Sequence, residues 1–86
     1  MPEISRFYGI IIRMFYREHG PPHFHAEYGE QEAVVAIESL EVLVGYLSPR
    51  ARGLVVEWAF LHQDELFDNW LRTRASRVPL RIEPLP

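Results

Sequence analysis

The sequence predicts an α+β fold, a small antiparallel β-sheet of three to four strands packed on one long C-terminal helix and followed by a short edge strand. Strand-like patterns rich in β-branched and aromatic residues fill the first half of the chain, and a helical pattern of apolar residues fills most of the second half. Strands followed by a helix are typical of α+β proteins. The 86 residues, 48% of them hydrophobic, suffice for a single domain over residues 1–86 with one core.

The first predicted strand spans residues 7–17, the densest run of β-branched and aromatic side chains. Because side chains alternate along a strand, every second residue of this run shares one face. We assign to the core face Tyr8, Ile10, Ile12, Met14 and Tyr16. The opposite, half-solvated face carries Arg13 and Arg17, which we expect to pair with the acidic hairpin that follows, or to bind an anion near the histidines.

Residues 23–28 and 32–37 read as the next two strands, joined by a turn at Gly29 and Glu30 into a hairpin. With the first strand they form an antiparallel meander. Residues 40–47 fit either a fourth strand or a helical turn, and Gly45 favours a strand end or a bulge.

A helix is expected to begin at Ser48 and Pro49, because serine caps helix N-termini and proline is well placed in the first turn. Apolar residues then recur at steps of three and four as far as residue 70, a pattern that also allows a kink. This stripe assigns three residues to the core, Trp58, His62 and Trp70. Residues 78–83 alternate like a short strand, which Pro79 and Pro84 would restrict to a sheet edge.

The charges are strongly segregated along the chain. The net charge is −3, and between Glu18 and Pro49 there are six glutamates and no basic residue. All nine basic residues are arginines, and four of them lie in the tail after residue 71. This balance disfavours nucleic acid, which needs a basic surface. The basic tail could complement the acidic segment within the fold, across a homodimer, or on a partner protein.

The sequence shows neither a signal peptide nor an apolar run long enough to span a membrane, so we expect a cytoplasmic protein. There are no cysteines, so any metal site must use histidine and carboxylate.

The segment 18–25 gathers three of the four histidines around a pair of prolines. On a strand, His23 and His25 share a face with their roots about 7 Å apart, so both imidazoles can reach one ion. His19, folded back by the proline loop, is the expected third ligand, and the ion would be Zn or another divalent metal. We expect the rings to gather on one water-accessible patch. Glu18 and Glu27, with the two arginines, are expected contacts for a partner or an anion.

The histidine block is also compatible with a purely structural role, in which the rings stack on aromatic side chains and bond to carbonyls or to nearby glutamates.

Motifs along most of the chain resemble a family of short bacterial proteins catalogued as the domain of unknown function number four thousand one hundred and sixty. The resemblance rests on residues 9–12, on the block His-Gly-Pro-Pro-His-Phe-His at 19–25, on the helix start at 47–51, and on Glu57-Trp58 and Asn69-Trp70. It implies a standalone cytoplasmic protein, often encoded beside another small protein as in toxin-antitoxin pairs.

Three hypotheses for function follow. The favoured one is a protein-interaction component of such a two-gene pair. The alternatives are a metal-dependent hydrolase or ribonuclease-like toxin that uses the histidine cluster, and a histidine block that only holds the fold.

Overall fold

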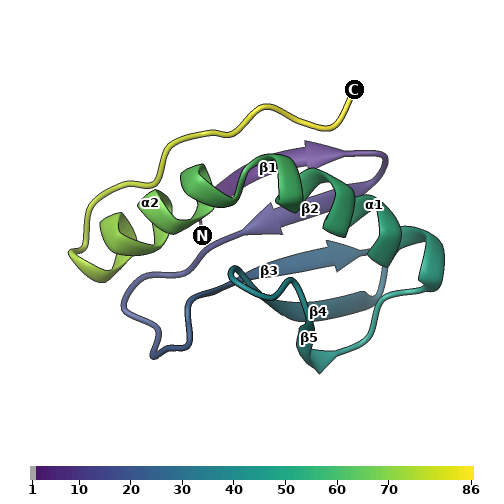
Figure 1. Ribbon diagram of the computed structural model, residues 1–86, viewed down its shortest axis with the longest axis horizontal. Helices are drawn as coiled ribbons and strands as arrows, with labels where there is room; N and C mark the ends of the chain where they lie inside the picture. The colour runs from purple at the N-terminus through teal and green to yellow at the C-terminus, as the bar shows by residue number, and fades with distance from the viewer. Residues whose placement is uncertain (1) are drawn as a thin grey trace.

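The computed structural model describes residues 2–86 and shows an α+β fold (Figure 1). In these residues five strands form one antiparallel sheet in the order β1-β2-β3-β4-β5, followed by two helices. The elements are β1 Glu3–Phe7, β2 Ile10–Arg13, β3 His23–Tyr28, β4 Gln31–Ala36, β5 Val42–Gly45, α1 Pro49–Leu61 and α2 Gln63–Arg74. The fold class and the meander are as predicted, but the sheet has five strands rather than three to four.

The predicted strand over residues 7–17 is wrong, because the chain turns sharply at Tyr8 and Gly9. Both residues have positive φ, 50° and 80°, and Phe7 pairs with Ile10, which defines a two-residue hairpin turn. The residues before the turn form β1, which the prediction missed. Ile10 and its even-numbered neighbours up to residue 14 are buried as parity predicted, whereas both tyrosines of that set are exposed.

The hairpin of β3 and β4 lies where the sequence predicted it, with Tyr28 paired to Gln31 across the turn. The ambiguous segment 40–47 contains a strand, β5, which pairs with β4. Gly45 ends β5 with a φ of 87°, and a Cβ there would lie 2.1 Å from the backbone oxygen of Glu32. Glycine is therefore required at this position by both conformation and space.

The helix begins as predicted, since the Ser48 hydroxyl accepts a hydrogen bond from the N–H of Ala51 and Pro49 occupies the first turn. It is two helices rather than one. At His62 φ is −130°, and the His62 N–H donates to the Ala59 carbonyl three residues back. Gln63, the next residue, donates from its side chain to the Ile37 carbonyl at 2.8 Å, which ties the break to the end of the sheet.

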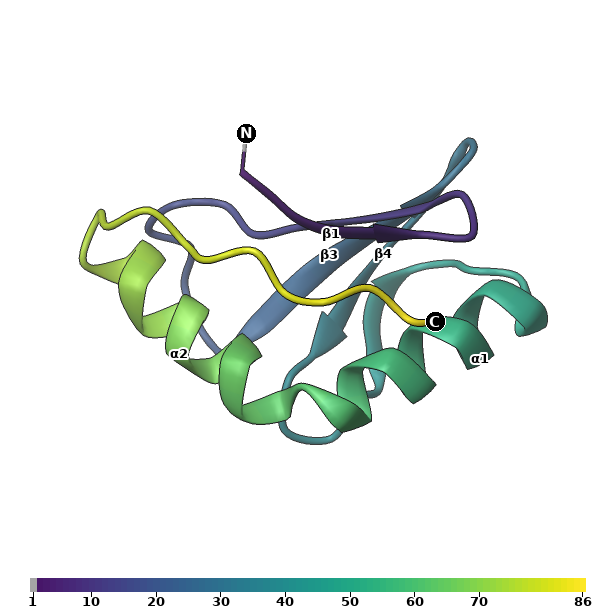
Figure 2. The same cartoon turned by 90° about the horizontal axis from the view of Figure 1, so that it is seen from above.

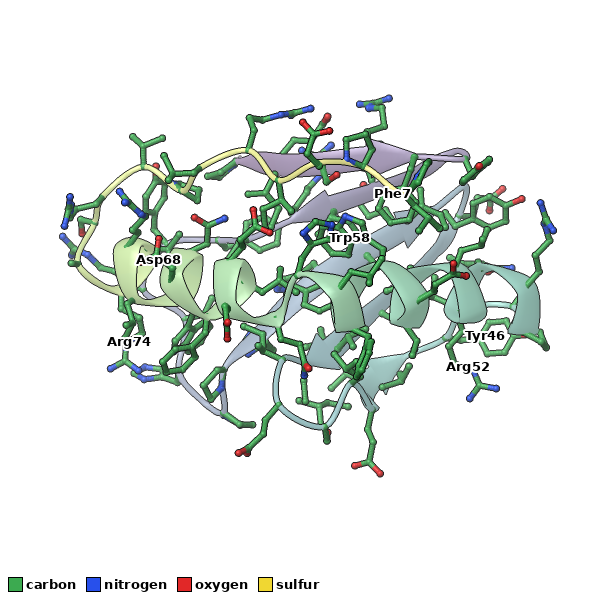
Figure 3. All side chains as sticks on the ribbon, turned by 45° about the horizontal axis from the view of Figure 1, so that its top comes forward. Phe7, Tyr46, Arg52, Trp58, Asp68 and Arg74 are labelled. Carbon is green, nitrogen blue, oxygen red and sulfur yellow. The ribbon has the colours of Figure 1, made fainter. Side chains whose placement is uncertain are left out.

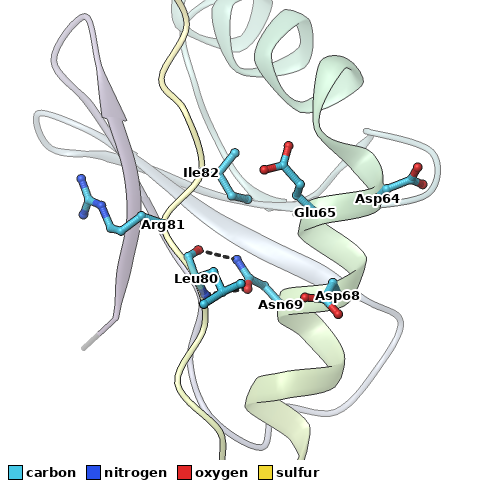
Figure 4. Close-up of a pocket in the computed structure, with 7 residues that line it drawn as sticks. All are labelled: Asp64, Glu65, Asp68, Asn69, Leu80, Arg81 and Ile82. Atoms are coloured by element: carbon cyan, nitrogen blue, oxygen red, sulfur yellow. Dashed lines mark hydrogen bonds between the residues drawn. The ribbon is translucent and has the colours of Figure 1, made fainter.

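The predicted strand over residues 78–83 is also wrong: this segment is extended and runs alongside β1 without forming a ladder (Figure 1). Ile82 donates one backbone hydrogen bond to Ile4 in β1. Prolines before and after it have no N–H to donate, so pairing cannot continue. The Asn69 side chain holds the segment instead, with 2.8 Å bonds to both the N–H and the carbonyl of Leu80 (Figure 4).

An ion-pair cluster joins the start of β1 to the C-terminal segment. Arg6 and Arg81 both bind the Glu3 carboxylate, at 2.8 and 3.2 Å. Hydrogen bonding from Arg6 is the main cause that lowers the pKa of Glu3 to about 2, and Arg81 adds to the shift.

Both helices cover the same face of the sheet, and the hydrophobic core lies between the helices and the sheet (Figure 2). Trp58 occupies its centre, with ring centroids 5.3 Å from Phe7 and 5.9 Å from Phe24, and its indole N–H donates to the Glu83 carbonyl (Figure 3). Trp58 and Trp70 are buried as predicted, and His62 packs half-buried against Trp58. The face that carries His25 lies opposite, since His25 alternates with the core residue Phe24.

Candidate functional site

The histidine block places two imidazole rings at the start of β3, beside the end of α2. His23 opens β3 and His25 follows two residues later, so the two side chains share the side of the strand opposite Phe24. His25 faces the side of the sheet that the helices leave uncovered, whereas His23 also contacts Trp70 of α2. The loop between β2 and β3 folds back over them. Its two sides are anchored by backbone bonds from Arg17 to the Thr73 carbonyl and from Ile37 to the Pro22 carbonyl. These anchors bring Glu18 over the strand.

The two rings converge on a single carboxylate oxygen. Nε2 of His23 lies 2.9 Å from Oε1 of Glu18, and Nε2 of His25 lies 2.8 Å from the same atom. Nδ1 of His23 lies 2.8 Å from the Pro21 carbonyl. Because a carbonyl oxygen can only accept, that Nδ1 carries a proton and its ring is fixed with Nε2 directed at Glu18.

The second ring nitrogen of His25 has no hydrogen-bond partner. Its Nδ1 is buried, and Oε2 of Glu32 lies 3.7 Å away, which is beyond hydrogen-bonding distance. A buried polar atom without a partner is uncommon and often marks a functional position. His25 and Glu32 also line a shallow cavity of about 220 Å³ on the same face, together with residues of β4 and β5.

Aromatic side chains enclose the rings. His23 lies 5.0 Å from the Trp70 ring, and His25 meets Phe15 edge-on at 4.4 Å. Both histidines are buried, with only 9% of each residue exposed, so the expectation of a water-accessible patch of imidazole rings is wrong. Solvent reaches the cluster at Glu18, whose side chain is 31% exposed. Burial acts to raise the pKa of Glu18, whereas hydrogen bonds from His25 and His23 act to lower it, and the net shift is downward.

This cluster has the donor atoms of a mononuclear metal centre. Within residues 2–86, Glu18, His23 and His25 form the one group in which three such ligand atoms lie within 4.8 Å of one another. Two imidazoles and one carboxylate are a common set for zinc and for non-haem iron. The bond from His23 to a backbone carbonyl is the second interaction that metal-binding histidines usually make.

The structure brings together two of the three histidines predicted as ligands. His19 is exposed and lies outside the group, and Glu18 takes the third place. The sequence analysis placed Glu18 among the partner contacts and did not include it with the candidate ligands. Its position just before the proline loop, which reverses the chain, was the feature of the sequence that could have placed Glu18 next to the histidines.

The remaining predicted contact residues lie around the cluster rather than in it. Arg13 forms an ion pair with Glu27 at 3.0 Å, which joins β2 to β3 as expected for the acidic hairpin. Arg17 donates from Nε to the Ser76 hydroxyl, so it ties the loop to the end of α2.

The fold and the cluster together define a small α+β protein with a histidine-carboxylate centre. A family model of a domain of unknown function, DUF4160, matches residues 9–71, which include the loop, both histidines and most of α2. The chain belongs to this family, as the resemblance of its motifs indicated.

The curated proteins and the solved structures gave no match. Over residues 2–86, neither helix is long and apolar enough to cross a membrane.

Proposed function

We propose that this protein binds one divalent metal ion through Glu18, His23 and His25, with zinc as the first candidate. The observation that carries the proposal is the convergence of two Nε2 atoms on one oxygen of Glu18. An ion would replace these two hydrogen bonds if the Glu18 oxygen moved back, and the shift needed is small because the three donor atoms lie within 4.8 Å of one another. The unpartnered Nδ1 of His25, near Glu32, supports the proposal, since a metal-bound imidazole can donate that N–H to a carboxylate.

Three protein ligands leave one position of a tetrahedral ion for water or substrate. A bound zinc ion supplies a hydroxide nucleophile near neutral pH. The exposed side of Glu18 is where a substrate would approach, because the aromatic side chains enclose the rest of the cluster. The enzymatic form of the proposal is therefore a hydrolase or ribonuclease-like toxin.

Metal binding is tested with untagged, chelator-stripped protein titrated with zinc in a calorimeter. We expect one ion per chain, and loss of tight binding in His25→Ala and Glu18→Ala. His19→Ala is the matched control, since it removes an exposed neighbouring imidazole outside the cluster, and it should bind as the wild type does. The absence of stoichiometric binding to the wild type, or equal loss in His19→Ala and His25→Ala, would contradict the proposed ligand set.

A second candidate function is a protein-interaction component of a two-gene, toxin-antitoxin-like pair. The charge segregation along the chain supports this function, and so do several exposed apolar side chains on the helices. These side chains are Phe60, Leu61, Phe67 and Leu71. Co-expression with the neighbouring gene product should yield a complex that survives purification.

Induction of the chain alone distinguishes the two candidates. Growth arrest that His25→Ala abolishes without unfolding the protein would favour the toxin enzyme. Failure of the neighbouring product to bind, together with a stable monomer, would remove the interaction component.

A further inference from the structure

The outer surface of the helices carries a stripe that the fold leaves uncovered. Phe60, Phe67 and Leu71 are 69%, 46% and 54% exposed. The buried residues of α2 lie on the side of the helix that faces the sheet. They are Leu66, Asn69, Trp70 and Thr73. Within α2, the exposed Phe67 and Leu71 lie at steps of three and four with two charged residues, Asp64 before them and Arg74 after them. Such spacing aligns side chains in one row along a helix and is typical of helix-pairing seams.

The stripe is acidic at one end and basic at the other. Asp64 has no ion pair within the described residues 2–86. Arg74 lies 5.8 Å from the Trp70 ring centroid, and its guanidinium is on the surface (Figure 3). The helix dipole accounts for acid at the start and base at the end of α2. It does not account for the exposed Phe67 and Leu71 between them.

We propose that a second copy of this chain docks on the stripe, with the two α2 helices antiparallel across a two-fold axis. A register centred between Phe67 and Leu71 places Phe67 against the partner's Leu71. The same register places Asp64 against the partner's Arg74.

A two-fold interface uses the same patch twice, so the patch must be complementary to itself. The stripe meets this requirement because the axis exchanges its acidic and basic ends, so each copy offers Asp64 where the other offers Arg74. The metal ligands are not part of the stripe, and the inference therefore stands apart from the proposed metal centre. A stripe on short helices is small for an interface, so we expect dissociation in the micromolar range.

The test is sedimentation equilibrium of untagged, full-length, metal-stripped protein over a range of concentrations. The wild type should be a concentration-dependent dimer. Asp64→Arg sets like charges against each other twice per dimer and should weaken association by at least about tenfold. The double variant Asp64→Arg with Arg74→Asp reverses both ion pairs and should restore the dimer. Leu71→Asp should give a monomer with an unchanged circular dichroism spectrum, because Leu71 is exposed in the single chain.

Glu30→Arg is the control, since it makes the same charge change at the turn between β3 and β4, away from α2. It should leave the dimer intact. A wild type that stays monomeric at all concentrations overturns the inference, and so does a dimer that tolerates Leu71→Asp. A double variant that remains as weak as Asp64→Arg overturns the antiparallel register.

Discussion

Replacing Glu18 by alanine in the metal-free protein tests the central geometry of the candidate site. Oxygen Oε1 of Glu18 is hydrogen-bonded to Nε2 of His23 at 2.9 Å and to Nε2 of His25 at 2.8 Å. Glu18→Ala removes that acceptor while the rings stay only 9% exposed, held by Trp70 and Phe15. Both imidazole rings then lose a hydrogen-bond partner in a largely buried position, which is the costly way to lose a hydrogen bond.

The expected loss of stability is about 2–3 kcal/mol. Hydrogen bonds to charged groups contribute about 1.5–3 kcal/mol each, so two give about 3–6 kcal/mol as an upper bound. The Glu18 side chain is 31% exposed, so water can enter the space left by its removal and form some of the hydrogen bonds that the two imidazole rings have lost. A domain of this length has a total stability of about 4–13 kcal/mol. At roughly 4–8 °C per kcal/mol, the melting temperature should fall by about 8–24 °C.

Urea unfolding, followed by tryptophan fluorescence in the presence of a chelator, measures this loss. Glu18→Gln keeps an oxygen acceptor and should lose about 1 kcal/mol. His19→Ala, the exposed neighbour, should stay within about 0.5 kcal/mol of the wild type. If Glu18→Ala also stayed within that margin, the two imidazoles would not depend on this carboxylate, and the convergent cluster would have to be abandoned.

Other expected outcomes concern the scaffold. Trp58→Ala, at the centre of the core, should cost about 3–5 kcal/mol in urea unfolding. A loss below 1 kcal/mol would be inconsistent with a buried Trp58. Gly45→Ala should cost about 2–3 kcal/mol, because the new Cβ would lie 2.1 Å from the Glu32 oxygen, and equal midpoints for the two proteins would argue against this close approach. Glu3 has a folded pKa of about 2, below its ordinary value of 4.5, so its contribution to stability is complete above pH 4.5 and is lost as the pH falls towards 2. Unfolding at pH 5 and pH 2.5 should show a smaller acid-induced loss in Glu3→Gln, and identical losses would exclude the link to Arg6.

Features encoded within a few consecutive residues were predicted correctly. The β3 strand follows from the alternation of His23 to Tyr28, and its turn follows from Gly29. The helix start follows from Ser48 and Pro49, because an N-cap is a local contact. Burial of Trp58 follows from helical periodicity in the same way.

One local turn and two features that depend on distant parts of the chain were missed. The run 7–17 looks continuous because its hydrophobicity does not change at Tyr8, where a non-glycine residue adopts positive φ in the turn. The helix break at His62 accompanies the bond from Gln63 to the end of β4. The tail has a strand-like pattern, but prolines remove its donors and Asn69 binds it instead.

The candidate site divides in the same way. Alternation along one strand is a two-residue property, so the sequence was enough to put His23 and His25 on a common face and to make them the candidate ligands. Their meeting with Glu18 depends on a loop whose path is held by Thr73 in α2 and by Ile37 beyond β4. Both anchors lie outside the loop, and the contact with Thr73 forms only when α2 packs on the sheet. The residue that joins the two histidines is therefore a property of the packed molecule, which no local pattern contains.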